Sequence, residues 1–216
     1  MQVQTRWASK WRMWLRWTLA TAAGEFFGFA IPALAGAAAV WLALGQIAMS
    51  WLLVAAGLGE GAVLGLTQWL ALRRSIPDLH GRAWVLATAL AAGIAWTLAM
   101  SLVTLGELNV LGRTALAILA LPFGIIFLCT IGGAQWWVLR RSIAHAGWWI
   151  LANAVAWPIG VTIPVFGMAL LPDTAGATTM LAVGVICGLL MGVVVGAITG
   201  VVLVRLLRER AVAGHF

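Results

Sequence analysis

Two acidic residues in otherwise apolar stretches are the best candidates for chemistry in this sequence. Glu25 lies in "ATAAGEFFGFA" and Glu60 in "VAAGLGEGAVLG", and neither stretch contains another charged residue. A charge inside a membrane-spanning segment is unfavourable by about 3 kcal/mol or more, so such residues are usually paired, neutral or functional. The two acids therefore predict either a proton or cation site on a transport path, or neutral side chains that donate hydrogen bonds to backbone carbonyls or contact a partner subunit.

A second group of polar residues lies near the ends of the apolar stretches. Gln68, Gln135 and Thr199 occupy equivalent places in three of them. Arginine pairs follow two of these places: Arg73, Arg74, Arg140 and Arg141. Together these groups would form a polar site at one membrane surface, suited to a phosphate or a carboxylate. Amides in such positions more often cross-link helices by hydrogen bonds worth about 1 kcal/mol each, and we favour this second interpretation.

Few other residues are suited to catalysis or cofactor binding. His80, His145 and His215 lie at or beyond the ends of the apolar stretches, and none has a cysteine or an acid at metal-ligand spacing. Cys129 and Cys187 lie within apolar stretches, where we interpret them as small hydrophobic residues. The sequence has no nucleophile elbow and no phosphate-binding loop. We therefore expect a protein that is not an enzyme and that binds no metal and no cofactor.

The composition predicts that lipid, rather than water, surrounds most of the chain. Of its 216 residues, 63% are hydrophobic and 9% are charged, whereas about a quarter of the residues of a soluble domain are charged. Six apolar segments are each long enough to cross a bilayer, for which about 20 helical residues suffice. They comprise residues 15–42, 47–72, 83–105, 114–139, 147–171 and 178–206. Because lipid offers the backbone no hydrogen-bond partners, we expect an all-α integral membrane protein with six transmembrane helices.

The basic residues indicate how these helices are oriented. Twelve of the 13 lysines and arginines lie at alternate ends of the six segments, and only Arg113 lies on the other side. The positive-inside rule makes the basic side cytoplasmic, with both chain termini there. The net charge of +7 then faces anionic lipid headgroups rather than nucleic acid, because the basic residues separate apolar runs instead of forming one basic face. The "ALA" at residues 33–35 resembles a signal cleavage site, but the apolar run continues past it, so we expect a retained helix.

The chain contains three similar hairpins. Each opens with a related motif directly after a basic cluster: "WTLATA" at Trp17, "WVLATA" at Trp84 and "WILANA" at Trp149. The return segments align as well, with glycines superposed along their length. We therefore expect three parallel helical-hairpin repeats. The predicted parts are a basic, Trp-rich segment at 1–16, hairpins at 17–76, 77–144 and 145–207, and a cytoplasmic tail at 208–216.

Glycine stripes run along several of the predicted helices. Glycines four residues apart lie on one narrow face of a helix, which another backbone can approach closely. They are Gly24, Gly28 and Gly36 in the first segment, Gly57, Gly61 and Gly65 in the second and Gly184, Gly188, Gly192, Gly196 and Gly200 in the sixth. We expect tight packing within the bundle, with an interface to a second copy or a partner subunit as the alternative. Glu25 and Glu60 each adjoin a stripe, so packing of the first helix on the second through these stripes would bring the carboxyls together, and at least one would hold a proton.

Tryptophan is abundant, with 14 residues, and most lie near the basic side. Trp96 and Trp157 are deeper exceptions. Residues 5–16 present three tryptophans on one face, and we expect this segment to lie along the membrane surface. Ten tryptophans form a predicted aromatic belt that anchors the cytoplasmic rim of the bundle. They are Trp7, Trp11, Trp14, Trp17, Trp69, Trp84, Trp136, Trp137, Trp148 and Trp149.

The segments "GLTQWLALRR" and "GGAQWWVLRR" share one pattern, GxxQWxxLRR, and "AGWW" follows the second. In these motifs the chain resembles a group of bacterial multi-pass membrane proteins with no established function. The resemblance is good around both motifs and weak in the third hairpin, where Thr199-Gly200 replaces Gln-Trp. It implies a protein of the bacterial inner membrane and no particular activity.

Two functions are compatible with these features. The scarcity of intramembrane polar residues favours a non-enzymatic structural or accessory subunit that packs against other membrane helices, or a second copy, and against lipid. The alternative is a small proton- or cation-linked transporter or channel that uses Glu25 and Glu60. We expect the first function, but a water-filled cavity beside the two carboxyls would favour the second.

Overall fold

The computed structural model describes residues 2–172 and 174–213, with the side chains of residues 11–127, 129–172, 174–176 and 178–210. These residues form six α-helices and no strand. The helices are α1 (Gln2–Trp41), α2 (Gln46–Leu72), α3 (Gly81–Glu107), α4 (Arg113–Leu139), α5 (Trp148–Ala169) and α6 (Ala177–Ala213). Each is long and apolar enough to span a membrane, so the chain is a multi-pass membrane protein, as its hydropathy predicts.

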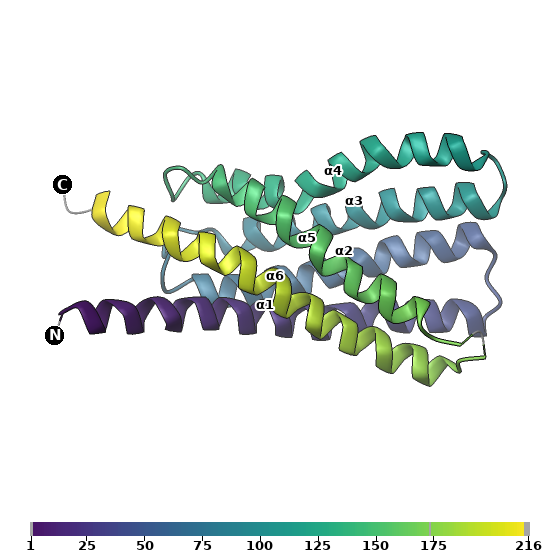
Figure 1. Ribbon diagram of the computed structural model, residues 1–216, viewed down its shortest axis with the longest axis horizontal. Coiled ribbons are helices and arrows are strands. Elements are labelled where there is room, and N and C mark those ends of the chain that lie inside the picture. Colours follow the sequence, from purple (N-terminus) through teal and green to yellow (C-terminus); the bar gives the residue numbers. More distant parts are fainter. Residues whose placement is uncertain (1, 173, 214–216) are drawn as a thin grey trace.

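The helices match the predicted segments closely, except at the two ends of the chain. There, α1 begins at Gln2 and α6 continues to Ala213, beyond the predicted spans. Residues 5–16, which the sequence predicts along the membrane surface, continue the axis of α1 as one helix (Figure 1). The sequence has no glycine or proline from residue 2 to residue 23, so nothing there interrupts the helical hydrogen bonds.

The six helices form a closed ring in the order of the sequence. Each packs against the helix before it and the helix after it, and α6 packs against α1. Within the described residues, helices that are not neighbours in this ring make no backbone-level contact. Successive helices run in opposite directions (Figure 1). The side chains of the six helices therefore line the centre of the ring, and no further helix of the described residues enters it.

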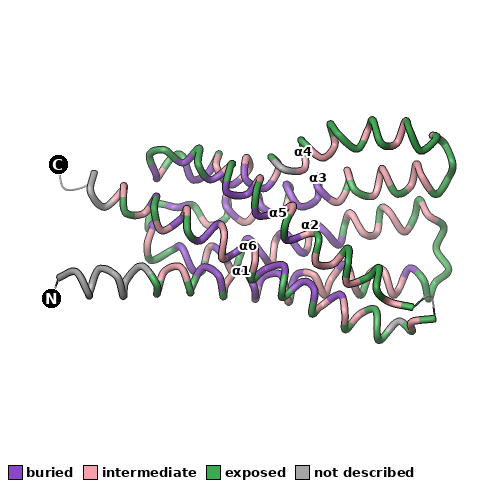
Figure 2. The backbone as a smooth tube through the Cα atoms, in the orientation of Figure 1, coloured by how far each residue is buried: buried purple, intermediate pink, exposed green. Residues whose placement is uncertain are grey.

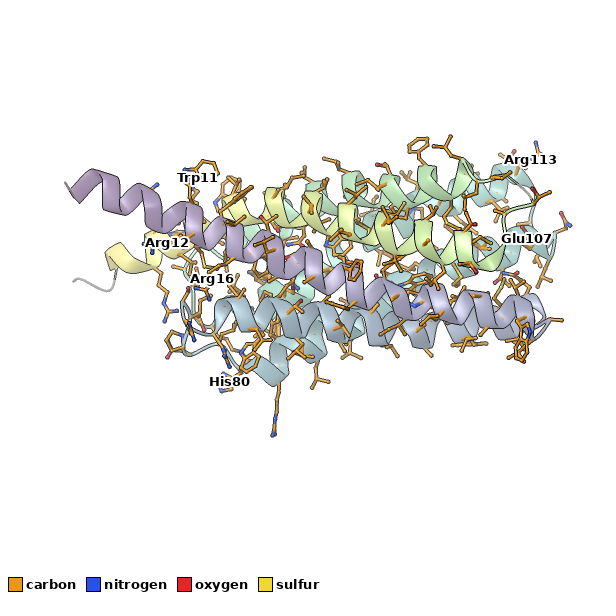
Figure 3. The ribbon with its side chains drawn as sticks, turned by 90° about the horizontal axis from the view of Figure 1, so that it is seen from below. Trp11, Arg12, Arg16, His80, Glu107 and Arg113 are labelled. Carbon is orange, nitrogen blue, oxygen red and sulfur yellow. The ribbon has the colours of Figure 1, made fainter. Side chains whose placement is uncertain are left out.

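The two ends of the ring differ in charge. Arg12 and Arg16 lie at the end that holds the start of α1, and Arg113 lies at the opposite end (Figure 3). Arg73 and Arg140 directly follow α2 and α4, whose last residues lie at the same end as the start of α1. We call this the basic end, and its position agrees with the predicted alternation of the basic residues.

Glycines allow α6 to lie close against α1. A β-carbon at Gly192 would lie 2.7 Å from the Cα of Ala22, and one at Gly196 would lie 2.9 Å from the Cα of Thr18. The other glycines of this stripe also face α1: Gly184, Gly188 and Gly200. Only a residue without a β-carbon permits such an approach, so this stripe is used inside the bundle.

The stripe on α2 faces α3 rather than α1. A β-carbon at Gly61 would lie 2.8 Å from the Cα of Ala89. The other two glycines of the stripe, Gly57 and Gly65, also face α3. On α1, Gly28 does face α2, where a β-carbon would lie 3.0 Å from the carbonyl oxygen of Glu60. The expectation that α1 and α2 pack through both of their stripes is therefore wrong for α2.

Burial is uneven along the ring. Figure 2 shows the buried residues gathered mainly in the basic half of the bundle and near its middle, whereas the opposite end is mostly intermediate or exposed. Helices α4 and α5 diverge toward that opposite end (Figure 1). Among the described residues, a β-carbon at Gly124 of α4 would meet nothing within 4 Å, although the aligned Gly57 and Gly188 are closely covered. Near the middle of the bundle, α4 and α5 are therefore packed less closely than the other neighbouring helices.

Candidate functional site

Three tryptophans close the centre of the ring at the basic end. Trp17, Trp84 and Trp149 come from α1, α3 and α5, and all three are fully buried. Their ring centroids lie 5.4 to 6.5 Å apart, mainly in edge-to-face contact. The prediction that these three lie in an interfacial belt is therefore wrong. Each lies on the inner face of its helix, where the large indole ring fills the space that the six helices enclose.

The other tryptophans of the predicted belt lie further out. Trp11, Trp137 and Trp148 are exposed, whereas Trp14, Trp69 and Trp136 are half-buried. The guanidinium of Arg140 lies 3.6 Å from the ring centre of Trp137 and 4.8 Å from that of Trp136, a cation–π geometry. These outward rings have the position that an interfacial belt requires. The side chain of Trp7 lies outside the described residues.

A layer of buried amides and hydroxyls lies next to the three tryptophans. Nε2 of Gln135 donates to Oε1 of Gln68 at 2.8 Å and to Oγ1 of Thr88 at 3.0 Å. Oε1 of Gln135 accepts a hydrogen bond of 3.0 Å from Nε1 of Trp149. Gln135 thus joins α4 to α2, α3 and α5.

The same layer continues on the other side of the ring. Nε1 of Trp17 donates to Oγ1 of Thr199 at 2.8 Å, and Nε2 of Gln68 donates to Oγ1 of Thr21 at 3.4 Å. Gln68, Gln135 and Thr199 are all buried. Gln68 and Gln135 are bonded to each other, whereas Thr199 is bonded to Trp17 of α1. They cross-link the helices, which is the interpretation that the sequence favours.

The four arginines predicted near these amides do not join them. All are exposed at the basic end: Arg73, Arg74, Arg140 and Arg141. Buried apolar residues lie between the arginines and the amides, among them Leu72, Ile76, Leu139, Ile143 and Leu203. The predicted polar site for a phosphate or carboxylate is therefore not formed. One helical turn beyond each buried amide or hydroxyl, an apolar side chain points into the centre of the ring.

The tryptophan pair Trp149 and Trp84 offers a matched test of this network. We expect Trp149→Phe to lower the free energy of unfolding by about 1–3 kcal/mol, because the buried Oε1 of Gln135 loses its indole donor. Nε1 of Trp84 has no hydrogen-bond partner in the described part of the chain, so Trp84→Phe removes similar ring area and no hydrogen bond. Unfolding in mixed micelles measures both values, and equal losses would contradict the assignment.

A cavity of about 210 Å³ lies at the centre of the ring. All six helices contribute to its wall, in chain order through Glu25, Glu60, Trp96, Phe127, Trp157 and Met191. Leu64 and Ile131 also line it, one helical turn from Gln68 and Gln135. The cavity therefore lies on the side of the amide layer that faces away from the basic end.

The carboxyls of Glu25 and Glu60 are the charged groups in this wall. Glu25 is 0% exposed and Glu60 is 6% exposed. Oε2 of Glu60 accepts a hydrogen bond of 2.7 Å from Nε1 of Trp96. Neither carboxyl oxygen of Glu25 accepts a hydrogen bond from a described residue outside the acid pair, and the carboxyl of Glu60 is the polar group that it faces. The two acids predicted from the sequence thus share one cavity and interact with each other there.

Helix packing explains why the two acids share this cavity. The close approach of α2 to Gly28 places Glu60 opposite α1, about one turn along from Glu25. On the other side, a β-carbon at Gly192 of α6 would lie 2.8 Å from the β-carbon of Glu25. The glycines therefore set the depth and the spacing of the acids, although the sequence assigns the α2 stripe to the wrong neighbour.

Aromatic residues around the carboxyls have no predicted role at the site. Trp96, Trp157, Phe29 and Phe127 all line the cavity. The depth of Trp96 and Trp157 is the signal that distinguishes them from the other tryptophans in the sequence. No comparable signal distinguishes Phe29 or Phe127 from lipid-facing phenylalanines.

This arrangement can hold a proton or a cation. Two carboxyls in an apolar cavity disfavour a double negative charge, so they retain a proton or bind a positive ligand. The described residues contain no group of three histidine, cysteine or acidic side chains placed to hold a metal ion. The chemistry available in the cavity is therefore proton exchange and the pairing of charge with one or two carboxylates.

The fold and the cavity define a class, namely a six-helix membrane protein with an acidic pair at its centre. A scan against models of protein families and searches of curated proteins and of solved structures find no match to this chain. The functional assignment therefore depends on the site itself.

Proposed function

We propose that the protein is a small proton- or cation-linked carrier in which Glu25 and Glu60 bind the transported ion. The observation that carries this proposal is the shared cavity, which is lined by both carboxyls and by all six helices. Glu25 is buried, lines this cavity with Glu60 and accepts no hydrogen bond from a described residue outside the acid pair, so nothing in the described structure fixes it for a structural role alone. The cavity therefore favours the transporter over the accessory subunit that the sequence alone favours.

A structural or accessory subunit is the second candidate, and α4 supports it. Most of the glycine stripes face other helices of the same chain, so they are not free to bind a partner. Gly124 and Gly133 of α4 differ, because a β-carbon at either would meet nothing within 4 Å in the described structure. This helix is the place where a second copy or another membrane subunit would pack.

We also propose an orientation and a location. The positive-inside rule makes the basic end cytoplasmic, with anionic lipid headgroups around its arginines. Equivalent positions at Trp17, Trp84 and Trp149 meet at the centre of the ring, which supports three parallel hairpin repeats. The motifs that resemble bacterial multi-pass proteins favour the bacterial inner membrane.

Proton flux through the purified protein tests the carrier. In liposomes that enclose a pH-sensitive dye, a potassium gradient with valinomycin imposes a membrane potential that drives proton entry. We expect acidification well above that of empty liposomes, and we expect Glu25→Gln and Glu60→Gln each to lower it to the empty-liposome rate, because an amide does not release a proton. The matched control is Glu107→Gln, an exposed acid at the end opposite the basic end, which should leave the flux unchanged.

Two results would contradict the proposal. One is a flux in the unaltered protein equal to that of empty liposomes, both under the potential and under a gradient of a small cation, with the protein monodisperse before reconstitution. The other is full flux in both cavity variants. A stable complex with another membrane protein after gentle extraction, together with either result, would support the accessory subunit instead.

A further inference from the structure

We infer that the ligand of the central cavity is a small organic ammonium ion, held by the Glu25 and Glu60 carboxyls and by the surrounding aromatic side chains. This inference rests on the proposed function and names the class of ion that the carrier takes. It follows from the polar groups that the cavity offers, from the nature of its walls and from its size.

The polar groups of the wall favour a positive ligand. Apart from the two carboxyls, the polar side-chain groups described there are the indole N–H groups of Trp96 and Trp157. Both are already used, since Trp96 donates to Oε2 of Glu60 and Trp157 donates to Oδ1 of Asn153 at 3.1 Å. An anion would find no free N–H donor in this wall. A cation finds the carboxyl pair, in which Glu25 accepts no hydrogen bond from any other described residue.

The walls favour an alkylated cation over a metal ion. Ca²⁺ and Mg²⁺ require six or more oxygen ligands, whereas two carboxyls supply four oxygens at most, one of them already bonded to Trp96. The rest of the wall is apolar and aromatic, with Phe29, Phe127 and Trp157 beside the acids. Aromatic rings attract ammonium groups and do not replace the water shell of a metal ion.

The size of the cavity limits the ion. Its volume of about 210 Å³ lies below the range of roughly 300–1,000 Å³ that is usual for drug-sized ligands. Tetramethylammonium and tetraethylammonium are of suitable size, whereas tetraphenylphosphonium, with four phenyl rings, is not.

Charge balance predicts that the ion exchanges with a proton. When the ammonium ion enters, the O–H bond of a protonated carboxyl breaks, the proton leaves to water, and the resulting carboxylate pairs with the ammonium. No other bond changes, and the total charge in the cavity stays the same. Binding should therefore release one proton for each cation.

Calorimetry with tetraethylammonium chloride tests this inference. The detergent-purified protein is titrated in two buffers that differ in ionisation enthalpy, and the difference between the two heats gives the number of protons released. We expect saturable binding with release of about one proton, and binding at least about tenfold weaker in Glu25→Gln, since the variant loses the anionic partner. Glu107→Gln is the matched control and should bind as the unaltered protein does. Phe127→Leu, which keeps an apolar side chain but removes a ring, should bind about three- to tenfold more weakly.

The outcomes separate this inference from the proposed function. Absence of saturable binding, unchanged affinity in a monodisperse Glu25→Gln, or equally tight binding of tetraphenylphosphonium would each overturn the organic-cation assignment. Proton flux in liposomes without tetraethylammonium binding would retain the carrier and overturn this inference alone. Binding of tetraethylammonium with proton release, but without proton flux when tetraethylammonium is present on one side of the liposome membrane, would support the ligand class and contradict the carrier.

Discussion

Gly192→Leu is expected to prevent α6 from closing the ring against α1. Even the first atom of the new side chain would lie 2.7 Å from the Cα of Ala22 and 2.8 Å from the β-carbon of Glu25. These neighbours are at or next to the backbone, so the helices must separate, and the remaining atoms of leucine increase the separation. We expect a loss of about 3 kcal/mol or more in the free energy of unfolding, the upper end of overpacking effects.

The matched control for this prediction is Gly124→Leu. Glycine 124 is also in mid-helix, but a β-carbon there meets nothing within 4 Å among the described residues, so leucine should cost little or even stabilise α4 through its higher helix propensity. Size-exclusion chromatography and thermal unfolding in detergent measure both variants. Similar stability of the two would mean that α6 and α1 do not pack through this glycine.

Glu25→Met is expected to make the protein more stable while it abolishes ion binding. The buried carboxyl of Glu25 loses its hydration, lies beside a second carboxyl and accepts no hydrogen bond from a described residue outside this pair, whereas methionine has similar length and no polar atom to desolvate. We expect an increase of about 1–3 kcal/mol in the free energy of unfolding, measured in mixed micelles. This gain is the sign of a group that is retained for function at the expense of stability.

Glu60→Met is the matched comparison, because it also removes a buried carboxyl from the same cavity. Here the substitution leaves the indole N–H of Trp96 without its acceptor, so the variant should be about 1–3 kcal/mol less stable than Glu25→Met. If Glu25→Met were instead strongly destabilised, the carboxyl of Glu25 would have a structural role, and the carrier would lose its main support.

Hydropathy alone predicts the six helices of this fold. Each apolar run had to be helical in lipid, and the short polar separators left little freedom in the boundaries. The basic residues likewise indicate which ends lie together. The order of the helices in the ring is not predicted in this way, because a glycine stripe indicates that a neighbouring helix packs closely but does not identify that helix. The stripe around Gly61 therefore suggested α1, whereas it packs on α3.

The same limit explains the three buried tryptophans. The position of a tryptophan within an apolar segment predicts its depth in the membrane. It does not predict whether the side chain points toward lipid or toward the centre of the bundle. A helical pattern was available, because Trp17, Thr21 and Glu25 are spaced four residues apart and so share one face. An acid on that face indicates the interior, and the tryptophan with it. The cavity itself was not predictable, because it depends on how six separate faces leave space between them.

The closure of the ring by α6 has a consequence for biosynthesis. Glu25 belongs to α1, whereas the glycines that cover one side of it belong to α6, which is translated after the other five helices. Until α6 is inserted, this carboxyl lacks one of its final neighbours. The nascent chain therefore carries an incompletely shielded polar group until the ring closes.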